Sequence, residues 1–510
     1  MTVAQRWVLT LTSLSAFMIA LDGTIVTTAL TTIKKSLGSS IEALEWTVSA
    51  YILTFAVLML SGSALGDRFG RRKVFVGGLI VFTAASAACG LSTTIAELIT
   101  ARAVQGAGAA VIMPLAMAQL GAAFPPEARG RAMGMSAGII GLATAGGPFV
   151  GGVVAQGLAW QWLFWVNVPV GVLVVVGVLF FMGETHGPQA RLDLVGVGLT
   201  TGGVLGLVWA LVRGNDVGWA APETLGSLGA GVVLAVAFVL WERRVAAPMV
   251  PMRFFGNRTF SAANFASFTV TAALYAVLFF LAQYYQQVMH YGPFGAGTRM
   301  MPFSATLLVF GPLSGRLSER FGERFLTGTG LALTALGLAA IAWQTGPDTS
   351  YPALVPALVV TGIGISTAIP QVQKAVVGAV RPQEIGQASG VFSMLRQFGA
   401  LFGTAVSVAV FAANGSYANV KTFSDGFTAA MSVGAGLAAT GAAVALLLLP
   451  GRRAAAVGGP AAVPTGQPQR GPEAGRPATV AATVAAPVST AVPAVVPAAV
   501  PAVVPASAAE

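Results

Sequence analysis

The sequence predicts an all-α polytopic membrane protein, because it is strongly apolar, carries few charges and contains many long hydrophobic runs. Of its 510 residues, 55% are hydrophobic and only 9% are charged, whereas soluble domains carry roughly 25% charged residues. A hydrocarbon core of roughly 30 Å needs about 20 apolar residues in helical form. Runs of this length recur along the chain, which excludes an ordinary soluble protein.

About fourteen apolar runs bounded by charges, Gly, Pro or Asn are long enough to cross a membrane. The first run follows Arg6. It exceeds the apolar core of a signal peptide, so we interpret it as a retained span. The predicted spans are 7–31, 45–65, 73–92, 96–119, 132–156, 162–183, 193–213, 224–242, 260–286, 297–316, 324–344, 351–373, 390–412 and 427–449.

Basic residues gather in alternate connections between these spans. One set of connections holds most of them, whereas the opposite set holds only Lys34, Lys35, Arg213, Arg299 and Lys421. Short loops rich in Lys and Arg stay in the cytoplasm. We therefore expect a multi-pass protein of a bacterial cytoplasmic (inner) membrane with both termini in the cytoplasm and an even number of spans.

The chain offers little for metal, redox or triad chemistry. It has one cysteine, Cys89, and two histidines, His186 and His290, both in predicted connections. A single thiol allows no disulfide within the chain, and no zinc site or catalytic triad can be assembled from these residues. The net charge of +10 follows from the loops and does not indicate nucleic acid. We expect neither an enzyme nor a bound metal.

Two segments in the first part of the chain recur in similar form in the second part. LGDRFGRR from Leu65 recurs as LSERFGER from Leu317, an offset of 252 residues, and QGAGAAVIMP recurs as TGIGISTAIP at an offset of 256. This repetition predicts a duplicated six-helix unit, as in transporters built from repeats around a midplane site.

The duplication divides the chain into four parts. The predicted domains are a six-helix half (1–192), two extra transmembrane helices (193–250), a second six-helix half (251–450) and an Ala/Val/Pro-rich cytoplasmic tail (451–510). Frequent proline prevents a packed helix in the tail, so we expect it to be disordered.

The segment SALGDRFGRR from Ser63 resembles the loop signature of the major facilitator superfamily between spans two and three, although Ser63 stands where the family usually has Gly. The resemblance implies the major facilitator fold and a gating loop, in which ion pairs break and re-form between conformations. The alternative is an ordinary cytoplasmic loop. The candidate gating residues are Asp67, Arg68, Gly70, Arg71 and Arg72.

Two further segments resemble the superfamily. RAVQGAG from Arg102 is similar to the fourth-span motif of its proton-coupled members, and Gly134 to Gly152 is similar to the fifth-span signature of exporters. Ala143 stands where that signature has Gly, but it is small enough for close helix contact. The candidate antiporter-type residues are Gly147, Pro148, Gly151 and Gly152. Simple helix packing is the alternative explanation.

Two ionisable residues, Asp22 and Arg102, fall well inside predicted spans. Such residues face a bundle interior and need a partner, so we expect them to pair. LDGTIV from Leu21 resembles the first span of the fourteen-span drug/proton antiporters, which implies proton coupling by Asp22 as Arg102 moves. The alternative is a static ion pair.

The resemblance implies a proton-coupled antiporter that exports drugs, antibiotics or related small organic molecules. An importer of a small solute with the same fold is the alternative. The expected partners are protons, the bilayer and a small amphipathic substrate; we expect no cofactor and a monomer. Aromatic side chains can supply stacking surfaces for such a substrate. The candidate substrate residues are Trp46, Tyr51, Tyr284 and Tyr285.

Overall fold

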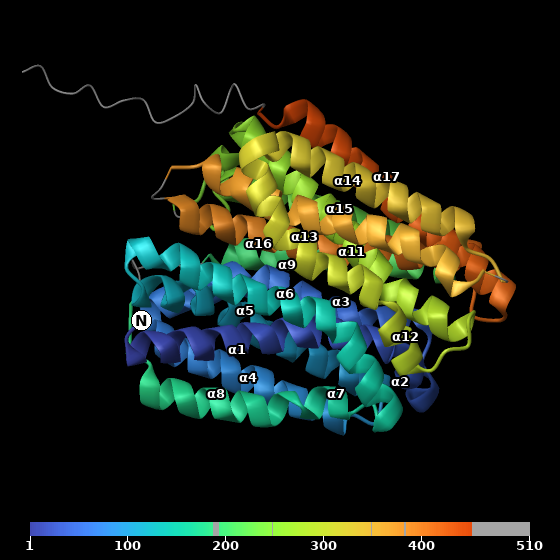
Figure 1. Cartoon of the computed structure of the whole chain (residues 1–510), viewed down its shortest axis with the longest axis horizontal. Helices are drawn as coiled ribbons and strands as arrows, with labels where there is room; N and C mark the ends of the chain where they lie inside the picture. The colour runs from blue at the N-terminus through green and yellow to red at the C-terminus, as the bar shows by residue number, and fades with distance from the viewer. Residues whose placement is uncertain (187–192, 247, 348, 382–383, 451–510) are drawn as a thin grey trace, which may run out of the picture. The chain divides into compact units, whose positions relative to one another are not determined.

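The computed structural model describes residues 1–186, 193–246, 248–347, 349–381 and 384–450 (Figure 1). In this part of the chain the regular structure consists of α-helices and two short 3₁₀ helices. The predicted all-α class is confirmed.

The helices are α1 (Val3–Ile25), η1 (Val26–Thr28), α2 (Leu30–Leu37), α3 (Ile41–Phe69), α4 (Arg71–Leu91), α5 (Ile95–Ala123), α6 (Pro126–Gly157), α7 (Trp162–Trp165), α8 (Asn167–Phe181), α9 (Leu194–Val217), α10 (Pro222–Glu242), η2 (Met252–Gly256), α11 (Arg258–Gln287), α12 (Pro293–Arg299), α13 (Met301–Phe321), α14 (Glu323–Gln344), α15 (Tyr351–Gly378), α16 (Ile385–Asn414) and α17 (Val420–Leu448).

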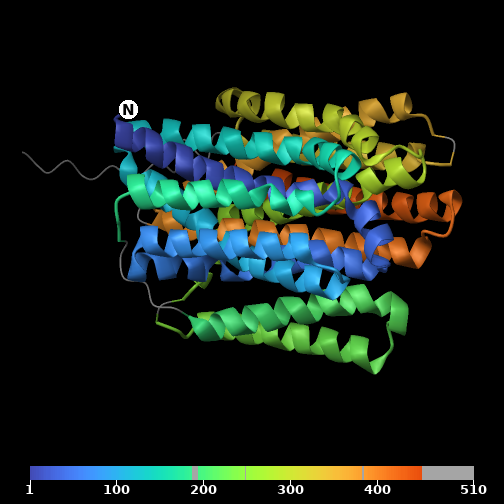
Figure 2. The same ribbon diagram turned by 90° about the horizontal axis from the view of Figure 1, so that it is seen from below.

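Within the described residues, thirteen helical segments are long and apolar enough to cross a membrane. The one predicted span without a match among these thirteen is 297–316, the tenth in order, which corresponds to α12 and α13. The 21-residue α13 carries Arg316 and Arg320 near its end, which lowers its hydropathy, but it packs against α15 like the other long helices. Consecutive long helices run back and forth between an end that holds the N-terminus, called the N-terminal end, and an opposite end, called the far end (Figure 2).

Several helix starts are fixed by local sequence. Thr2, Thr94 and Asn419 each form a capping box at the start of α1, α5 and α17. Proline occupies the first position of α6 and α10, where its missing N–H leaves no helical hydrogen bond unmade. Such caps supply partners for the first backbone N–H groups of a helix, which have no acceptor within it.

The long helices form two packed groups and a separate pair. In the first group α1 lies on α6, and α5 lies on α3 and α4; in the second, α14 lies on α15 and α17, and α11 lies on α16 and α17. Helices α9 and α10 pack on each other along one side of the bundle (Figure 2). Helix α9 also contacts α3 of the first group and α16 of the second, and α6 contacts α13.

The two groups share backbone geometry at equivalent positions. Gly70 between α3 and α4 has φ of 105°, and Gly322, 252 residues later between α13 and α14, has φ of 84°. Residues other than glycine rarely adopt a positive φ of this size, because their Cβ atom would clash with the backbone. Glycine therefore allows both tight turns. The internal repeat seen in the sequence is thus also present in the backbone.

The groups also share close helix contacts. A methyl group placed on Gly106 of α5 would lie 2.2 Å from Thr54 Oγ1 of α3. At the repeated position, a methyl group on Gly362 of α15 would lie 2.0 Å from Thr306 Oγ1 of α13. Small residues let membrane helices approach this closely. Equivalent glycines therefore bring equivalent helices together in each group.

The domain limits remain predictions. The boundary at 192/193 adjoins residues 187–192, which are outside the described residues, and the boundary at 250/251 falls in the connection before α11. The tail 451–510 also lies outside them.

Gly106→Ala and Gly362→Ala should each destabilise the protein, because a methyl group enters a filled contact. Overpacking of this kind costs about 1 to 3 kcal/mol. We expect a lower melting temperature in detergent for both variants. Gly138→Ala is the control, since nothing lies within 4 Å of its added methyl group. Melting temperatures equal to that of the control would contradict the prediction.

Candidate functional site

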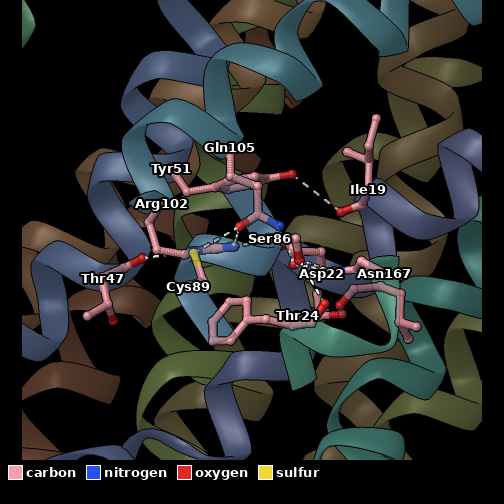
Figure 3. A network of polar contacts seen from close by, with 12 residues as sticks. Ile19, Asp22, Thr24, Thr47, Tyr51, Ser86, Cys89, Arg102, Gln105 and Asn167 are labelled. Atoms are coloured by element: carbon pink, nitrogen blue, oxygen red, sulfur yellow. Dashed lines mark hydrogen bonds and ion pairs between the residues drawn. The ribbon is translucent and has the colours of Figure 1, made fainter. Parts of the chain in front are cut away.

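Asp22 of α1 and Arg102 of α5 form a buried ion pair in the first helix group (Figure 3). Arg102 Nη1 lies 2.5 Å from Asp22 Oδ2, and the exposed fractions of the two side chains are 1% and 0%. The pairing expected from the sequence is therefore present. Because both charges are sealed from solvent in this conformation, each depends on the other for compensation.

Two amide side chains complete the surroundings of Asp22. Its Oδ1 accepts hydrogen bonds from Gln105 Nε2 and from Asn167 Nδ2, each at 2.9 Å. Asn167 Nδ2 also donates to Ser86 Oγ at 3.1 Å. Side chains from α5 and α8 thus meet at one carboxylate of α1, and Ser86 of α4 is linked to it through Asn167.

Arg102 has partners beyond the carboxylate. Its Nε donates to the carbonyl of Thr47 at 3.1 Å, and its Nη1 donates to Gln105 Oε1 at 2.7 Å. The guanidinium carbon lies 4.2 Å from the centre of the Tyr51 ring and 5.7 Å from that of Phe164. The aromatic faces stabilise the cation, and α3 joins the helices that contact the pair.

Local sequence accounts for part of this arrangement. Arg102 and Gln105 are three residues apart on α5 and share one helix face. Gly106 follows on α5 and brings α3 close enough for Thr47 and Tyr51 to reach the arginine.

Gln105, Asn167 and Ser86 are not predicted from the sequence, because the prediction rests on charged residues and these side chains are neutral. A useful signal would have been an amide within an apolar run, since amides in membrane helices need partners. The prediction of two ionisable residues well inside spans is wrong. Arg396 of α16 lies within the span Gln387–Asn414 and is a further one.

The candidate gating loop joins α3 to α4. Arg71 Nε lies 2.7 Å from Asp67 Oδ1, both side chains being mostly buried. The Arg68 guanidinium lies over the Phe69 ring at 5.3 Å. The structure thus brings Asp67 and Arg71 together, whereas Arg72 has other partners.

Glu184, which is not predicted from the sequence, contacts this loop from the connection after α8. Its carboxylate accepts from the backbone N–H of Arg72 at 2.8 Å and of Lys73 at 3.3 Å. Arg72 Nη1 donates to the carbonyl of Met182 at 3.0 Å. A carboxylate at the start of α4 is favoured by the helix dipole. The residue was missed because it is more than 100 positions from the loop.

Ion pairs also occupy the repeated loop region. Lys374 Nζ lies 3.3 Å from Glu323 Oε1 at the start of α14. Nearby in sequence, Glu384 accepts from Arg381 and also pairs with Arg253, each at 2.8 Å. The hydrogen bond from Arg381 holds the pKa of the Glu384 carboxyl below its usual range. Charged contacts thus hold helix starts at the N-terminal end in both groups.

The antiporter-type motif lies where α6 touches α1 and α12. A methyl group on Gly147 would lie 1.9 Å from Thr24 Oγ1, and one on Gly151 would lie 2.2 Å from the carbonyl of Ile25. Gly152 faces the carbonyl of Pro293 on α12, and the carbonyl of Pro148 is close to Gly297. These small residues let α6 contact both helix groups near the far end.

The four candidate substrate aromatics do not form one group. Tyr51 contacts the ion pair, whereas the Trp46 ring lies 5.9 Å from that of Trp209 on α9. Tyr284 stacks on Phe427 and donates to the carbonyl of Gly346 at 3.0 Å, and Tyr285 is fully buried beside it. Their role in substrate binding stays a prediction. Among the described residues, no group of three or more His, Cys, Asp or Glu side chains could hold a metal ion.

Comparison with known proteins assigns a family. The family model described as Major Facilitator Superfamily matches residues 12–404 and 263–495. The chain is 34% identical over 415 residues to the multidrug resistance protein Stp of Mycobacterium tuberculosis, covering 81% of this chain and 77% of the relative. It is 36% identical to the cephamycin export protein CmcT of Amycolatopsis lactamdurans, covering 77% and 82%.

A solved structure agrees in fold. A bacterial homologue of the human lysosomal transporter Spinster, crystallised in an inward-facing and unoccupied conformation, superposes with a TM-score of 0.64 at 17% identity. The similarity covers 88% of this chain and 97% of that one.

Asp22→Asn should destabilise the protein, because Arg102 would remain buried without a counter-charge. Removing one partner of a buried pair costs about 3 to 5 kcal/mol. Arg102→Gln should be similarly destabilising, and the double variant should be more stable than either single variant. Melting temperatures in detergent test this. Single variants that melt like the unchanged protein would show that the pair does not stabilise the fold.

Proposed function

Because the chain belongs to the major facilitator superfamily, a family of membrane transporters, we propose that it exports drugs, antibiotics or related small organic molecules across a bacterial cytoplasmic membrane in exchange for protons. The named functions of its relatives, multidrug resistance and cephamycin export, support export as the direction and drug-like molecules as the cargo. The sealed Asp22–Arg102 pair is the observation that carries the proton-coupling part of the proposal.

The pair links proton binding to helix movement. A proton on Asp22 would remove its negative charge and leave Arg102 buried as an isolated cation, which is strongly unfavourable. Arg102 would then have to find other partners, and α5 would move relative to α1. Since neither side chain is accessible in this conformation, proton exchange itself requires another conformation. The coupling needs no cofactor.

Contacts between the two helix groups favour a state closed at the far end. Gln286 of α11 donates to the carbonyl of Thr28 at 2.9 Å, and Thr31 donates to Gln286. Phe294 N–H donates to Gln156 Oε1 at 3.0 Å. These bonds lie beside the contact between α6 and α12. Alternating access requires this end to close and reopen during each cycle.

The basic connections lie at the N-terminal end, and the positive-inside rule therefore supports an orientation with both termini in the cytoplasm. With this orientation the far end faces outward. The Asp67–Arg71 pair and the Glu184 cap then lie on the cytoplasmic side, where they would stabilise one conformation of the loop. We propose that the protein works as a monomer.

Proton-driven efflux should be lost in Asp22→Asn and in Arg102→Ala. The first variant cannot bind the proton at this position, and in the second no ion pair is left for protonation to break. Dye accumulation is measured in a pump-deficient host at equal surface expression, with and without an uncoupler. Asp425→Asn is the control, since Asp425 is exposed on α17. Unchanged efflux in both site variants would remove the coupling role, and gradient-driven dye uptake would indicate an importer.

Gly147→Ala should reduce efflux, whereas Gly146→Ala should not. The methyl group on Gly147 would meet Thr24 Oγ1 at 1.9 Å, but nothing lies within 4 Å of one on Gly146. Separating α6 from α1 costs about 1 to 3 kcal/mol and shifts the balance of conformations by roughly 5- to 150-fold. Initial rates of dye efflux at matched expression provide the measurement. Equal rates in the two variants would contradict this role of Gly147.

A further inference from the structure

Arg396 is an arginine inside a membrane span that the ion-pair network does not use. It is the tenth residue of the span Gln387–Asn414 on α16 and is only partly exposed. A guanidinium at this depth is costly in lipid, so it faces the protein interior or an aqueous space. Its position therefore requires a partner or a function.

The structure gives Arg396 no such partner. Its Nε has no accessible surface and no hydrogen-bond partner within the described residues, and no ion pair to it is found there. Arg102, by contrast, has a carboxylate, an amide and a carbonyl. Among the described residues from 251 to 450, the acidic residues lie between helices or within about six residues of a helix end. They are Glu319, Glu323, Glu384 and Asp425, whereas Asp348 is outside the described residues.

Arg396 lies on the side of α16 that faces the core of the bundle. Gly399, three residues later and on the same side, touches Phe268 of α11. Arg396 is also within electrostatic range of Tyr275 of α11. The Tyr275 hydroxyl in turn lies 4.0 Å from the position of a methyl group on Gly23, the neighbour of Asp22. Arg396 thus approaches the ion pair from the opposite helix group.

The ion pair does not supply a counter-charge for Arg396. Asp22 and Arg102 neutralise each other, so Arg396 is a positive charge in addition to the pair. Tyr275 is partly exposed, and no hydrogen bond to its hydroxyl is found in the described part of the chain. A planar guanidinium binds carboxylates and similar oxyanions through two parallel hydrogen bonds. A phenol beside it adds a further donor.

We propose that Arg396 binds an anionic group of the exported molecule, a carboxylate or a comparable oxyanion, with Tyr275 as a neighbouring donor. The inference rests on the proposed export function and specifies its substrate class. It replaces the sequence-based expectation of an amphipathic substrate of unspecified charge with that of an amphipathic anion. Export of an anion is also favoured by a membrane potential that is negative inside.

A binding experiment tests the role of Arg396 without transport. The probes are 7-methoxycoumarin-3-carboxylate and its uncharged ethyl ester, which share one ring system. The full-length protein is held in nanodiscs of phosphatidylcholine alone, which excludes an anionic lipid headgroup as the partner. Arg396→Gln should weaken carboxylate binding at least tenfold and leave ester binding unchanged, whereas Arg396→Lys should fall between. Arg258→Gln, an exposed arginine on α11, is the control.

Three results would overturn the proposal: no carboxylate binding to the unchanged protein, equal carboxylate binding after Arg396→Gln, or equal loss of both probes in that variant. Proteoliposomes with an imposed pH gradient separate this proposal from the export function. If the pH gradient drives movement of the ester but the carboxylate does not bind, the export function stands and the role of Arg396 is contradicted. If carboxylate binding depends on Arg396 but the gradient moves neither probe, the anion site stands and proton-driven export is contradicted.

Discussion

The ion pair between Asp22 and Arg102 is the interaction on which the first helix group depends. It is enclosed by helices whose side chains satisfy both the carboxylate and the guanidinium, and neither charge reaches solvent. A buried charge that loses its partner is far less stable than one exposed to water. Any change at Asp22 must therefore be transmitted to α5 and its neighbours, which makes the pair suitable for coupling a proton to a conformational change.

Small residues determine how closely the helices around this pair approach one another. Gly106 and Gly362 bring equivalent helices together in the two groups, and Gly147 and Gly151 bring α6 against α1. Packing between lipid-embedded helices gains little from the hydrophobic effect and depends on close contact and internal hydrogen bonds. The polar network around the ion pair lies within the first group. The protein thus combines a buried polar centre in one group with close glycine contacts between helices in both.

The sequence predicted the spans, the repeat and the Asp22–Arg102 contact because each leaves a local signal. Hydrophobic length identifies a span, duplicated letters identify the repeat, and a charge in an apolar run requires a partner. Asn167 and Glu184 were missed, since the partners of both are distant in sequence. Asn167 is also neutral, and Glu184 lies in a connection, where charged residues are common. Arg396 was visible in the sequence and was overlooked. The sequence could not indicate its lack of a partner, because that depends on which side chains three-dimensional packing brings near it.

The pair α9 and α10 has a consequence for how molecules dissolved in the bilayer approach the protein. Helix α9 touches both α3 and α16, so it covers the seam between the two groups on that side. On another side α6 of the first group contacts α13 of the second directly. A lipid-soluble compound diffusing within the membrane therefore meets the pair α9 and α10 on one side and the contact between α6 and α13 on another. The two additional helices thus make the lipid-facing surface of the protein differ between these two sides.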